Sequence, residues 1–313
     1  MRRSSRSLLV LAAAALLTWA SANTAAAEPY PVDYNFFAGI APELTNPGGS
    51  LPGANDPDCV PSAAHPNPVV LLHGTGGGAQ TNWGVYAPLL ANEGYCVYSL
   101  TYGAYGLPWP VSAIGGMRPI EQSGLEVSAF VDRVLARTGA AKVDFIAHSQ
   151  GNIVGNYYIK RLGGAAKVDK LVGIAPPWLG TNAFGAGDIA TFSRALGAGP
   201  AFDAVSSSLC QACGQMFTGS PFMTALNADG VYSPQVTYTN IVSSIDELVV
   251  PYTSGLVPGP NATSVVVQDG CAQDYSEHMA IAGSPRAAAH ALNALDPARQ
   301  APVPCEFVPP FTG

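Results

Sequence analysis

The sequence predicts an α/β protein with a mainly parallel sheet and helices on both faces of that sheet. Short apolar runs such as PVVLLHG, which starts at Pro68, show no alternation of apolar and polar residues, as is typical of strands buried on both faces. Segments with helical spacing separate these runs, and several end at a glycine. Strands and helices that alternate along most of a chain are typical of a parallel sheet.

The first 27 residues have the composition of a secretory signal peptide. Three arginines precede an apolar run over residues 8–20, and small residues follow as far as Ala27. The run is about 13 residues long, whereas a membrane-spanning helix needs roughly 20. We expect cleavage after Ala27 and a secreted, extracellular product, residues 28–313, that forms a single domain without stable membrane insertion.

The predicted elements follow one another in a regular order. Residues 28–67 are rich in Pro, Gly, Asn and Asp and indicate an irregular arm wrapped over the domain. Helices are expected over residues 82–94 and 118–139, after Ser149, and over 286–295; strands are expected over residues 69–72, 95–102, 142–148, 167–176, 236–244 and 263–269. Between Pro176 and Pro234 the alternation lapses, which a small lid or cap insertion and ordinary connecting helices explain equally well.

Charge and cysteine content narrow the classes of partner and cofactor. The chain has 14 Lys and Arg against 21 Asp and Glu, and loss of the first 27 residues removes three arginines, so the net charge falls from −7 to −10. This balance argues against nucleic acid as a partner. Six cysteines favour disulfides in an exported protein, and proximity along the chain suggests the pairs Cys59–Cys96, Cys210–Cys213 and Cys271–Cys305. Cys210 and Cys213 have no second pair or histidine cluster nearby, so we expect no metal.

A candidate nucleophile lies in the stretch KVDFIAHSQGNIVGNYY, residues 142–158, which reads as strand, sharp turn and helix. Ser149 stands at the turn, where a strained conformation exposes the hydroxyl group above the sheet. The usual signature is G-x-S-x-G, and Ala147 replaces its first glycine with a residue only one methyl group larger. The strand before Ser149 and the helix after it supply the context that the motif requires.

Backbone donors for an oxyanion are expected on two segments. One N–H comes from the residue after the nucleophile, Gln150, at a helix N-terminus. The other is expected from the glycine-rich loop HGTGGG, residues 73–78, where we select Thr75. A phosphate-binding loop is the rival interpretation, but no Lys-Ser/Thr pair follows the glycines.

The base and the acid are expected after Ser149 in the order acid, then histidine. His278 lies in a loop, DYSEHMAI, whereas His290 lies within a regular terminal helix. Asp246 directly follows a predicted strand and is the favoured acid; Glu247 and Asp269 are the reserves. His148 is expected to pack beside the turn, and His73 to brace the glycine loop.

Several strings together resemble the secreted class 2 lipases of actinobacteria, which are α/β-hydrolases related more distantly to yeast B-type and small bacillary lipases. These strings are NWGVYAPLLANEGY, AHSQGN, KLVGIAPPWLGT, DELVVPYTS, SEHMAI and ALNALDPA. The resemblance implies an α/β-hydrolase fold, a Ser149-Asp246-His278 triad, oxyanion donors at Thr75 and Gln150, and hydrolysis of carboxylic esters without a cofactor. Such lipases usually have a second glycine after S-Q-G, where this chain has Asn152, and this departure puts the shape of the substrate pocket in question.

The expected activity is that of a secreted lipase on triacylglycerol or other lipid esters at an oil–water interface, with the protein as a monomer. A short-chain esterase or a polyester or cutin-type hydrolase would use the same residues. A non-catalytic exported binding protein on a hydrolase scaffold is a further alternative, but such a protein is expected to lose a member of the triad or the glycines of residues 74–78, and none is missing.

Overall fold

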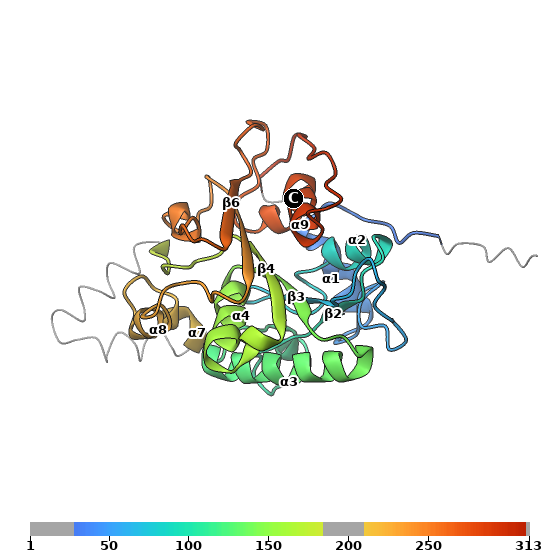
Figure 1. The fold of residues 1–313 in the computed structure, drawn as a ribbon, viewed down its shortest axis with the longest axis horizontal. Coiled ribbons are helices and arrows are strands. Elements are labelled where there is room, and N and C mark those ends of the chain that lie inside the picture. Colours follow the sequence, from blue (N-terminus) through green and yellow to red (C-terminus); the bar gives the residue numbers. More distant parts are fainter. Residues whose placement is uncertain (1–27, 184–209, 311–313) are drawn as a thin grey trace, which may run out of the picture.

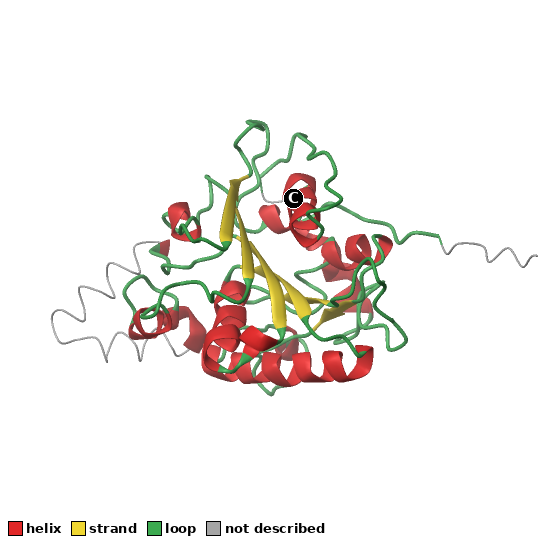
Figure 2. Ribbon diagram, viewed as in Figure 1, coloured by secondary structure: helices red, strands yellow, loops and turns green. Residues whose placement is uncertain are grey.

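The computed structural model describes residues 28–183 and 210–310. The predicted signal peptide, residues 1–27, lies outside the described residues, as does the middle of the predicted cap, residues 184–209. Figures 1 and 2 show a central twisted sheet with helices packed against it.

Within the described residues the sheet has six strands, and all of their pairings are parallel, as the sequence predicts. Its order is β2-β1-β3-β4-β5-β6. The strands are β1 (Val69–Leu72), β2 (Val97–Ser99), β3 (Val143–His148), β4 (Val168–Ile174), β5 (Thr237–Val242) and β6 (Ala262–Val266). Because β1 and β3 lie side by side near the centre, the loops that follow them meet at the same edge of the sheet.

Helices cover the two faces of the sheet. The α-helices are α1 (Ile40–Thr45), α2 (Tyr86–Asn92), α3 (Ile120–Thr138), α4 (Gln150–Arg161), α7 (Gln211–Gln215), α8 (Pro221–Leu226) and α9 (Pro285–Leu295). The short 3-10 helices are η1 (Phe36–Gly39), η2 (Val111–Ala113), η3 (Gly164–Ala166), η5 (Tyr252–Gly255) and η6 (Ala280–Ala282). Figure 1 shows α3 and α4 on one side of the sheet and α2 and α9 on the other.

Strand β1 shows why its apolar run has no alternation. Val70 and Leu72 belong to one buried cluster with residues of α3 and α4, whereas Val69 and Leu71 belong to a second cluster with residues of α2 and α9. All four side chains are fully buried. Successive side chains of a strand point to opposite faces, so a sheet covered on both sides needs apolar residues at every position.

The arm before β1 is more regular than the sequence predicts, because it contains η1 and α1. At Gly39 the arm lies against the backbone of Gln80. Only glycine fits there, because a Cβ would lie 2.0 Å from the backbone oxygen of Gln80. The Cys59–Cys96 disulfide ties the arm to the residue before β2. This pairing and the pairings Cys210–Cys213 and Cys271–Cys305 confirm the three predicted disulfides.

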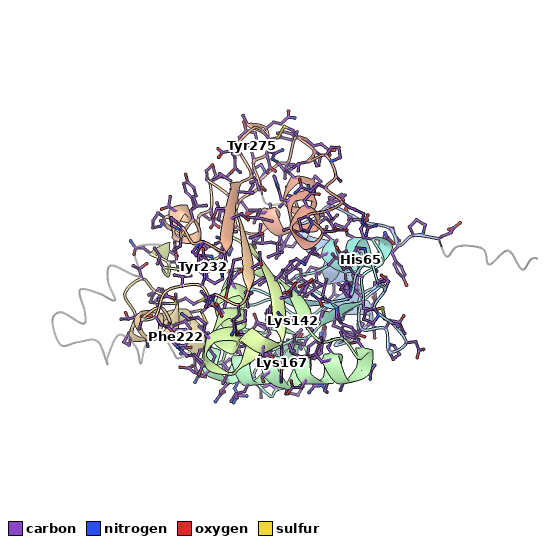
Figure 3. All side chains as sticks on the ribbon, in the orientation of Figure 1. His65, Lys142, Lys167, Phe222, Tyr232 and Tyr275 are labelled. Carbon is purple, nitrogen blue, oxygen red and sulfur yellow. A yellow bond between two sulfur atoms is a disulfide. The ribbon has the colours of Figure 1, made fainter. Side chains whose placement is uncertain are left out.

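The described part of the predicted cap contains two short helices. Helix α8 packs against α4, where the ring of Phe222 lies 5.8 Å from that of Tyr157. Tyr232 follows α8, and its ring lies 4.7 Å from that of Tyr238 on β5. Figure 3 labels Phe222 and Tyr232 on the same side of the molecule. These aromatic contacts join the described cap residues to the main domain.

Candidate active site

Ser149 lies between the end of β3 and the start of α4, in the predicted sharp turn. Its backbone angles are φ 52° and ψ −122°, and it is one of three non-glycine residues with positive φ in the described chain. Such a conformation costs on the order of 1–3 kcal/mol and persists only where the surroundings hold it. The N–H of Ser149 donates to the carbonyl oxygen of Ile174 at the end of β4, 2.9 Å away.

The residues two before and two after Ser149 are small, as the tight packing around the turn requires. A Cβ at Gly151 would lie 2.1 Å from the backbone oxygen of Leu72, so only glycine fits there. Ala147 is fully buried, and Leu72 and Gly173 are its partners in the neighbouring strands. The methyl group of Ala147 belongs to the buried apolar cluster that includes residues of α3 and α4, so it is accommodated at the position where the signature has glycine.

His278 and Asp246 form a close, buried pair. Nδ1 of His278 lies 2.8 Å from Oδ2 and 2.9 Å from Oδ1 of Asp246. Asp246 Oδ1 also accepts the backbone N–H groups of Leu248 and Val249, at 2.9 and 2.7 Å. These bonds fix the carboxylate, which in turn fixes the imidazole with Nε2 as its remaining ring nitrogen.

The reserve acids have other surroundings. Glu247 is exposed, and its Oε2 accepts the backbone N–H of His278 at 3.2 Å, so it supports the loop rather than the ring. Asp269 is exposed after β6. His290 is half-buried on α9, and burial lowers its pKa.

The glycine-rich loop after β1 faces Ser149. The Gly74 N–H donates to Asn82 Oδ1. The Gly76 N–H donates to the backbone oxygen of Gly115, and the Gly77 N–H donates to that of Gly74. By contrast, no acceptor for the Thr75 N–H is found among residues 28–183 and 210–310. The Gln150 side chain reaches this loop: its Nε2 donates to Thr75 Oγ1 at 3.0 Å and to the Gly116 carbonyl at 2.9 Å.

Two buried histidines flank the loop. His73 Nδ1 lies 2.8 Å from the Gly74 carbonyl, its Nε2 accepts the Tyr102 N–H at 3.1 Å, and its ring stacks on that of Tyr102. It therefore braces the loop, as predicted. Burial lowers the pKa of His73 to about 4 and that of His148 to about 3, so both rings are neutral at pH 7.

His148 does more than the packing that the sequence predicts. Its Nε2 lies 2.9 Å from the backbone oxygen of His278, and its Nδ1 lies 3.1 Å from Oδ1 of Asn82. Asn82 Oδ1 also accepts the Gly74 N–H. His148 thus contacts both the His278 loop and a residue that holds the glycine loop. Nothing in the residue types alone indicates these contacts, because they depend on side-chain direction across three loops.

A cavity of about 410 Å³ contains the candidate residues. Ser149, His278 and Thr75 line it. Apolar side chains from four segments form the rest of its wall: Phe36, Phe37 and Ile40 from η1 and α1; Met216 and Phe217 after α7; Leu248 and Val249 after β5; and Met279 beside His278. The site is therefore a serine and a histidine in the wall of a mainly apolar hollow.

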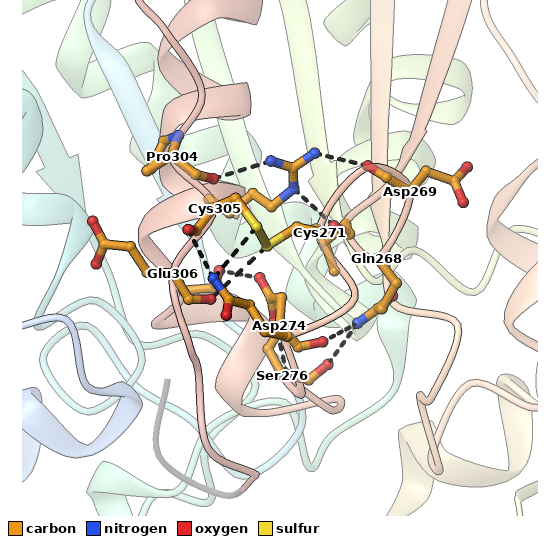
Figure 4. The surroundings of a disulfide bond; sticks show 12 residues. Gln268, Asp269, Cys271, Asp274, Ser276, Pro304, Cys305 and Glu306 are labelled. Carbon is orange, nitrogen blue, oxygen red and sulfur yellow. Dashed lines mark hydrogen bonds between the residues drawn. A yellow bond between two sulfur atoms is a disulfide. The ribbon is translucent and has the colours of Figure 1, made fainter.

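A disulfide lies behind the His278 loop. Figure 4 shows Cys271 bonded to Cys305, so the segment that carries His278 is tied to the C-terminal tail. Gln268 donates from Nε2 to the backbone oxygens of Asp274 and Ser276, at 3.2 and 3.5 Å. The loop is thus fixed at its start by a covalent bond and along its length by hydrogen bonds.

Among residues 28–183 and 210–310, no group of three His, Cys, Asp or Glu side chains is placed to hold a metal ion. In the same residues no helix has both the length and the apolar character needed to cross a membrane.

Comparison with solved structures gives the same fold. Lipase B from Aspergillus fumigatus is 19% identical with a TM-score of 0.57; the match covers 78% of this chain but only 56% of that one. A Bacillus licheniformis lipase in its mature form is 15% identical with a TM-score of 0.51, over 73% of this chain and 91% of that one. At these identities the likeness shows a shared α/β-hydrolase fold.

The model of one protein family matches the sequence directly. The family is described as Lipase (class 2), and the match runs over residues 66–289, which include the glycine-rich loop, Ser149, Asp246 and His278. The match also covers most of the described chain. The protein therefore belongs to the class 2 lipase family.

Proposed function

We propose that the protein is an exported serine hydrolase that cleaves carboxylic esters of lipids, that is, a lipase. The observation that carries this proposal is the shared cavity of Ser149 and His278, in which the imidazole has Asp246 on its far nitrogen. A serine hydroxyl is a weak nucleophile unless a base removes its proton, and this arrangement provides that base.

The proposed acylation uses all three side chains. Ser149 Oγ attacks the ester carbonyl carbon while His278 Nε2 takes its proton. Asp246 stabilises the imidazolium that forms and keeps the ring in one orientation, because its carboxylate is already held by two backbone N–H groups. His278 then returns the proton to the alkoxide oxygen as the alcohol leaves. Water repeats the sequence on the acyl-enzyme and releases the acid.

We assign two backbone N–H groups as the donors that stabilise the negative charge on the carbonyl oxygen. The Thr75 N–H lacks an acceptor in the described chain although its neighbours are bonded, and the Gln150 N–H lies at the start of α4. Donors that are already oriented stabilise the tetrahedral intermediate without reorganisation, which is worth about 10²–10³ in kcat for each donor in measured cases.

The walls of the cavity favour an apolar acyl group. Phe37 and Ile40 line the cavity and are also 43% and 39% exposed, so apolar surface continues from the hollow to the outside. This continuity suits a lipid ester presented at an oil–water interface better than a short soluble ester. A polyester film would meet the same surface, and comparing rates on triacylglycerol emulsion, p-nitrophenyl butyrate and polymer film separates these substrates.

Export is part of the proposal. Three disulfides favour an oxidising compartment, and the first 27 residues have the composition of a signal peptide. Expression of the full chain in a secreting host is expected to yield a monomer in the medium that begins at Glu28. N-terminal sequencing and light scattering of the secreted protein check both points.

The deciding experiment is Ser149→Ala. The variant is expected to lose hydrolysis of p-nitrophenyl butyrate and to lose labelling by a fluorophosphonate, while its melting temperature stays close to that of the parent. The matched control is Ser62→Ala, an exposed serine in the arm. Turnover retained by Ser149→Ala would overturn the proposed function.

A further inference from the structure

The side chain of Asn152 occupies the narrow space beneath the turn that carries Ser149. It is fully buried in the first turn of α4, at the position where the resemblance to class 2 lipases implies a second glycine. Its Nδ2 lies 3.2 Å from the backbone oxygen of Ala147, 3.0 Å from that of Ser149 and 3.1 Å from that of Ile174. One amide thus faces three carbonyl groups from β3, the turn and β4.

These three carbonyls fix which way the amide points. An Asn side chain with its oxygen in this place would bring four acceptors together, so Nδ2 must face the carbonyls. Its Oδ1 then points at Gly173 and accepts no hydrogen bond from the described residues. A Cβ at Gly173 would lie 2.3 Å from Oδ1, so Asn152 fits only because residue 173 is glycine.

The contacts of Asn152 bear on both reacting parts of the site. Ile174 O accepts the Ser149 N–H as well as the Asn152 amide, so this carbonyl of β4 holds the strained residue directly and also through Asn152, whose amide donates to Ser149 O. Ser149 O belongs to the same peptide group as the Gln150 N–H. Hydrogen bonds to that oxygen orient and polarise the peptide group, and so strengthen its N–H as a donor.

We propose that Asn152 is a positioning residue that holds the Ser149 turn and aims the Gln150 N–H at the oxyanion. The inference rests on the proposed function, since it assigns Asn152 a part in the reaction of Ser149. A role in packing alone would affect stability, whereas a positioning role affects the chemical step. The two roles differ in what they do to kcat at a temperature where the protein is fully folded.

The test compares Asn152→Gly with Asn156→Gly. Asn156 is the matched control because it lies one turn later on α4, is also fully buried, and bonds Val231 and Tyr238 instead of the turn. Asn152→Gly is expected to lower kcat for p-nitrophenyl butyrate by about tenfold with little change in KM. It is also expected to slow phosphorylation by diethyl p-nitrophenyl phosphate. Asn156→Gly is expected to lower the melting temperature but to keep kcat at 25 °C.

Gly173→Ala provides a second variant that leaves Asn152 in place but pushes on its amide. It is expected to lower kcat in the parent protein and to have little further effect in Asn152→Gly, where the clash is removed. Wild-type kcat in Asn152→Gly, or equal kcat losses in the Asn152 and Asn156 variants, would overturn the inference. Turnover by Ser149→Ala would instead overturn the proposed function, so the two failures are distinguishable.

Discussion

The Nε2 atom of His148 lies 2.9 Å from the backbone oxygen of His278, and so the residue before the candidate nucleophile contacts the backbone of the candidate base. The other ring nitrogen lies 3.1 Å from Asn82 Oδ1. Because the ring is neutral, it has a single N–H to donate, and we assign that proton to Nε2 because its contact with the His278 carbonyl is the shorter of the two. His148 therefore links three loops that the sequence separates widely.

His148→Leu is expected to lower kcat about tenfold, because the His278 backbone loses its donor and the imidazole is held less firmly. Steady-state kinetics on p-nitrophenyl butyrate checks this. His290→Leu is the control, since that histidine lies half-buried on α9 away from the cavity. Equal kcat in both variants would contradict a role for the His148 contact.

Asp246→Asn is expected to lower kcat on the order of 10⁴-fold, because the amide favours the wrong imidazole tautomer and cannot stabilise the imidazolium. Glu247→Gln is the matched control: it changes the adjacent acid, whose carboxylate accepts the backbone N–H of His278 and has no other hydrogen bond within residues 28–183 and 210–310. The amide oxygen of Gln can accept the same bond, so kcat should change little. The two rates measured side by side decide which acid serves the ring.

Ile40→Ser is expected to raise KM for long-chain p-nitrophenyl esters more than for the butyrate, because it replaces apolar wall with a hydroxyl group. Leu44→Ser is the control on the same helix, 60% exposed and absent from the cavity lining. An acyl-chain-length profile of both variants measures the effect. A uniform change across all chain lengths would argue against an acyl site beside α1.

Asp144→Asn is expected to flatten part of the dependence of stability on pH. Burial raises the pKa of the Asp144 carboxyl to about 6, although Lys170 opposes the shift. The folded state therefore holds a proton that the unfolded state releases near pH 4, and this residue's contribution to stability falls as pH rises from about 4 to 6. The asparagine variant does not lose stability in this way. Its free energy of unfolding minus that of the parent should therefore grow across that window by up to about 3 kcal/mol. Urea unfolding at pH 4, 5, 6 and 7 measures it.

Replacing both cysteines of the Cys271–Cys305 pair by serine is expected to cost about 2–5 kcal/mol of unfolding free energy and to shorten the active half-life on warming. The bond closes a segment of 34 residues that contains His278. The Cys210–Cys213 pair spans only three residues and is the control, since a short closure constrains the unfolded chain less. Equal losses of stability in the two double variants would contradict this expectation.

The sequence predicts the strands and most of the candidate residues because their constraints are local or follow chain order. Apolar runs identify β1 and β3, and the strand–turn–helix pattern singles out Ser149. The order acid then histidine leads to Asp246 and His278, which the structure places in contact. Family resemblance adds to the same selection, since AHSQGN and SEHMAI surround two of these residues.

The contacts of Asn152 and His148 are beyond the reach of such patterns. Asn152 departs from the pattern that the resemblance implies, and its place depends on Gly173, a residue of the next strand. Its three acceptors come together only once β3 and β4 pair. His148 has the residue type of a possible base, but its backbone position aims it at the His278 carbonyl. Both roles depend on contacts between segments that are distant in the sequence, and neither hydrophobic periodicity nor a sequence motif predicts such contacts.

The wall made by Phe36, Phe37 and Ile40 has a consequence for the order in which the protein becomes active. These residues leave the ribosome before any strand of the sheet, yet they border a hollow whose floor needs β3 and the loops after β5 and β6. The Phe36 ring meets the ring of His148, with centroids 5.9 Å apart. This segment, which is synthesised before every strand of the sheet, is thus among the last that can find its final place, and substrate binding should arise late in refolding, after the sheet has assembled.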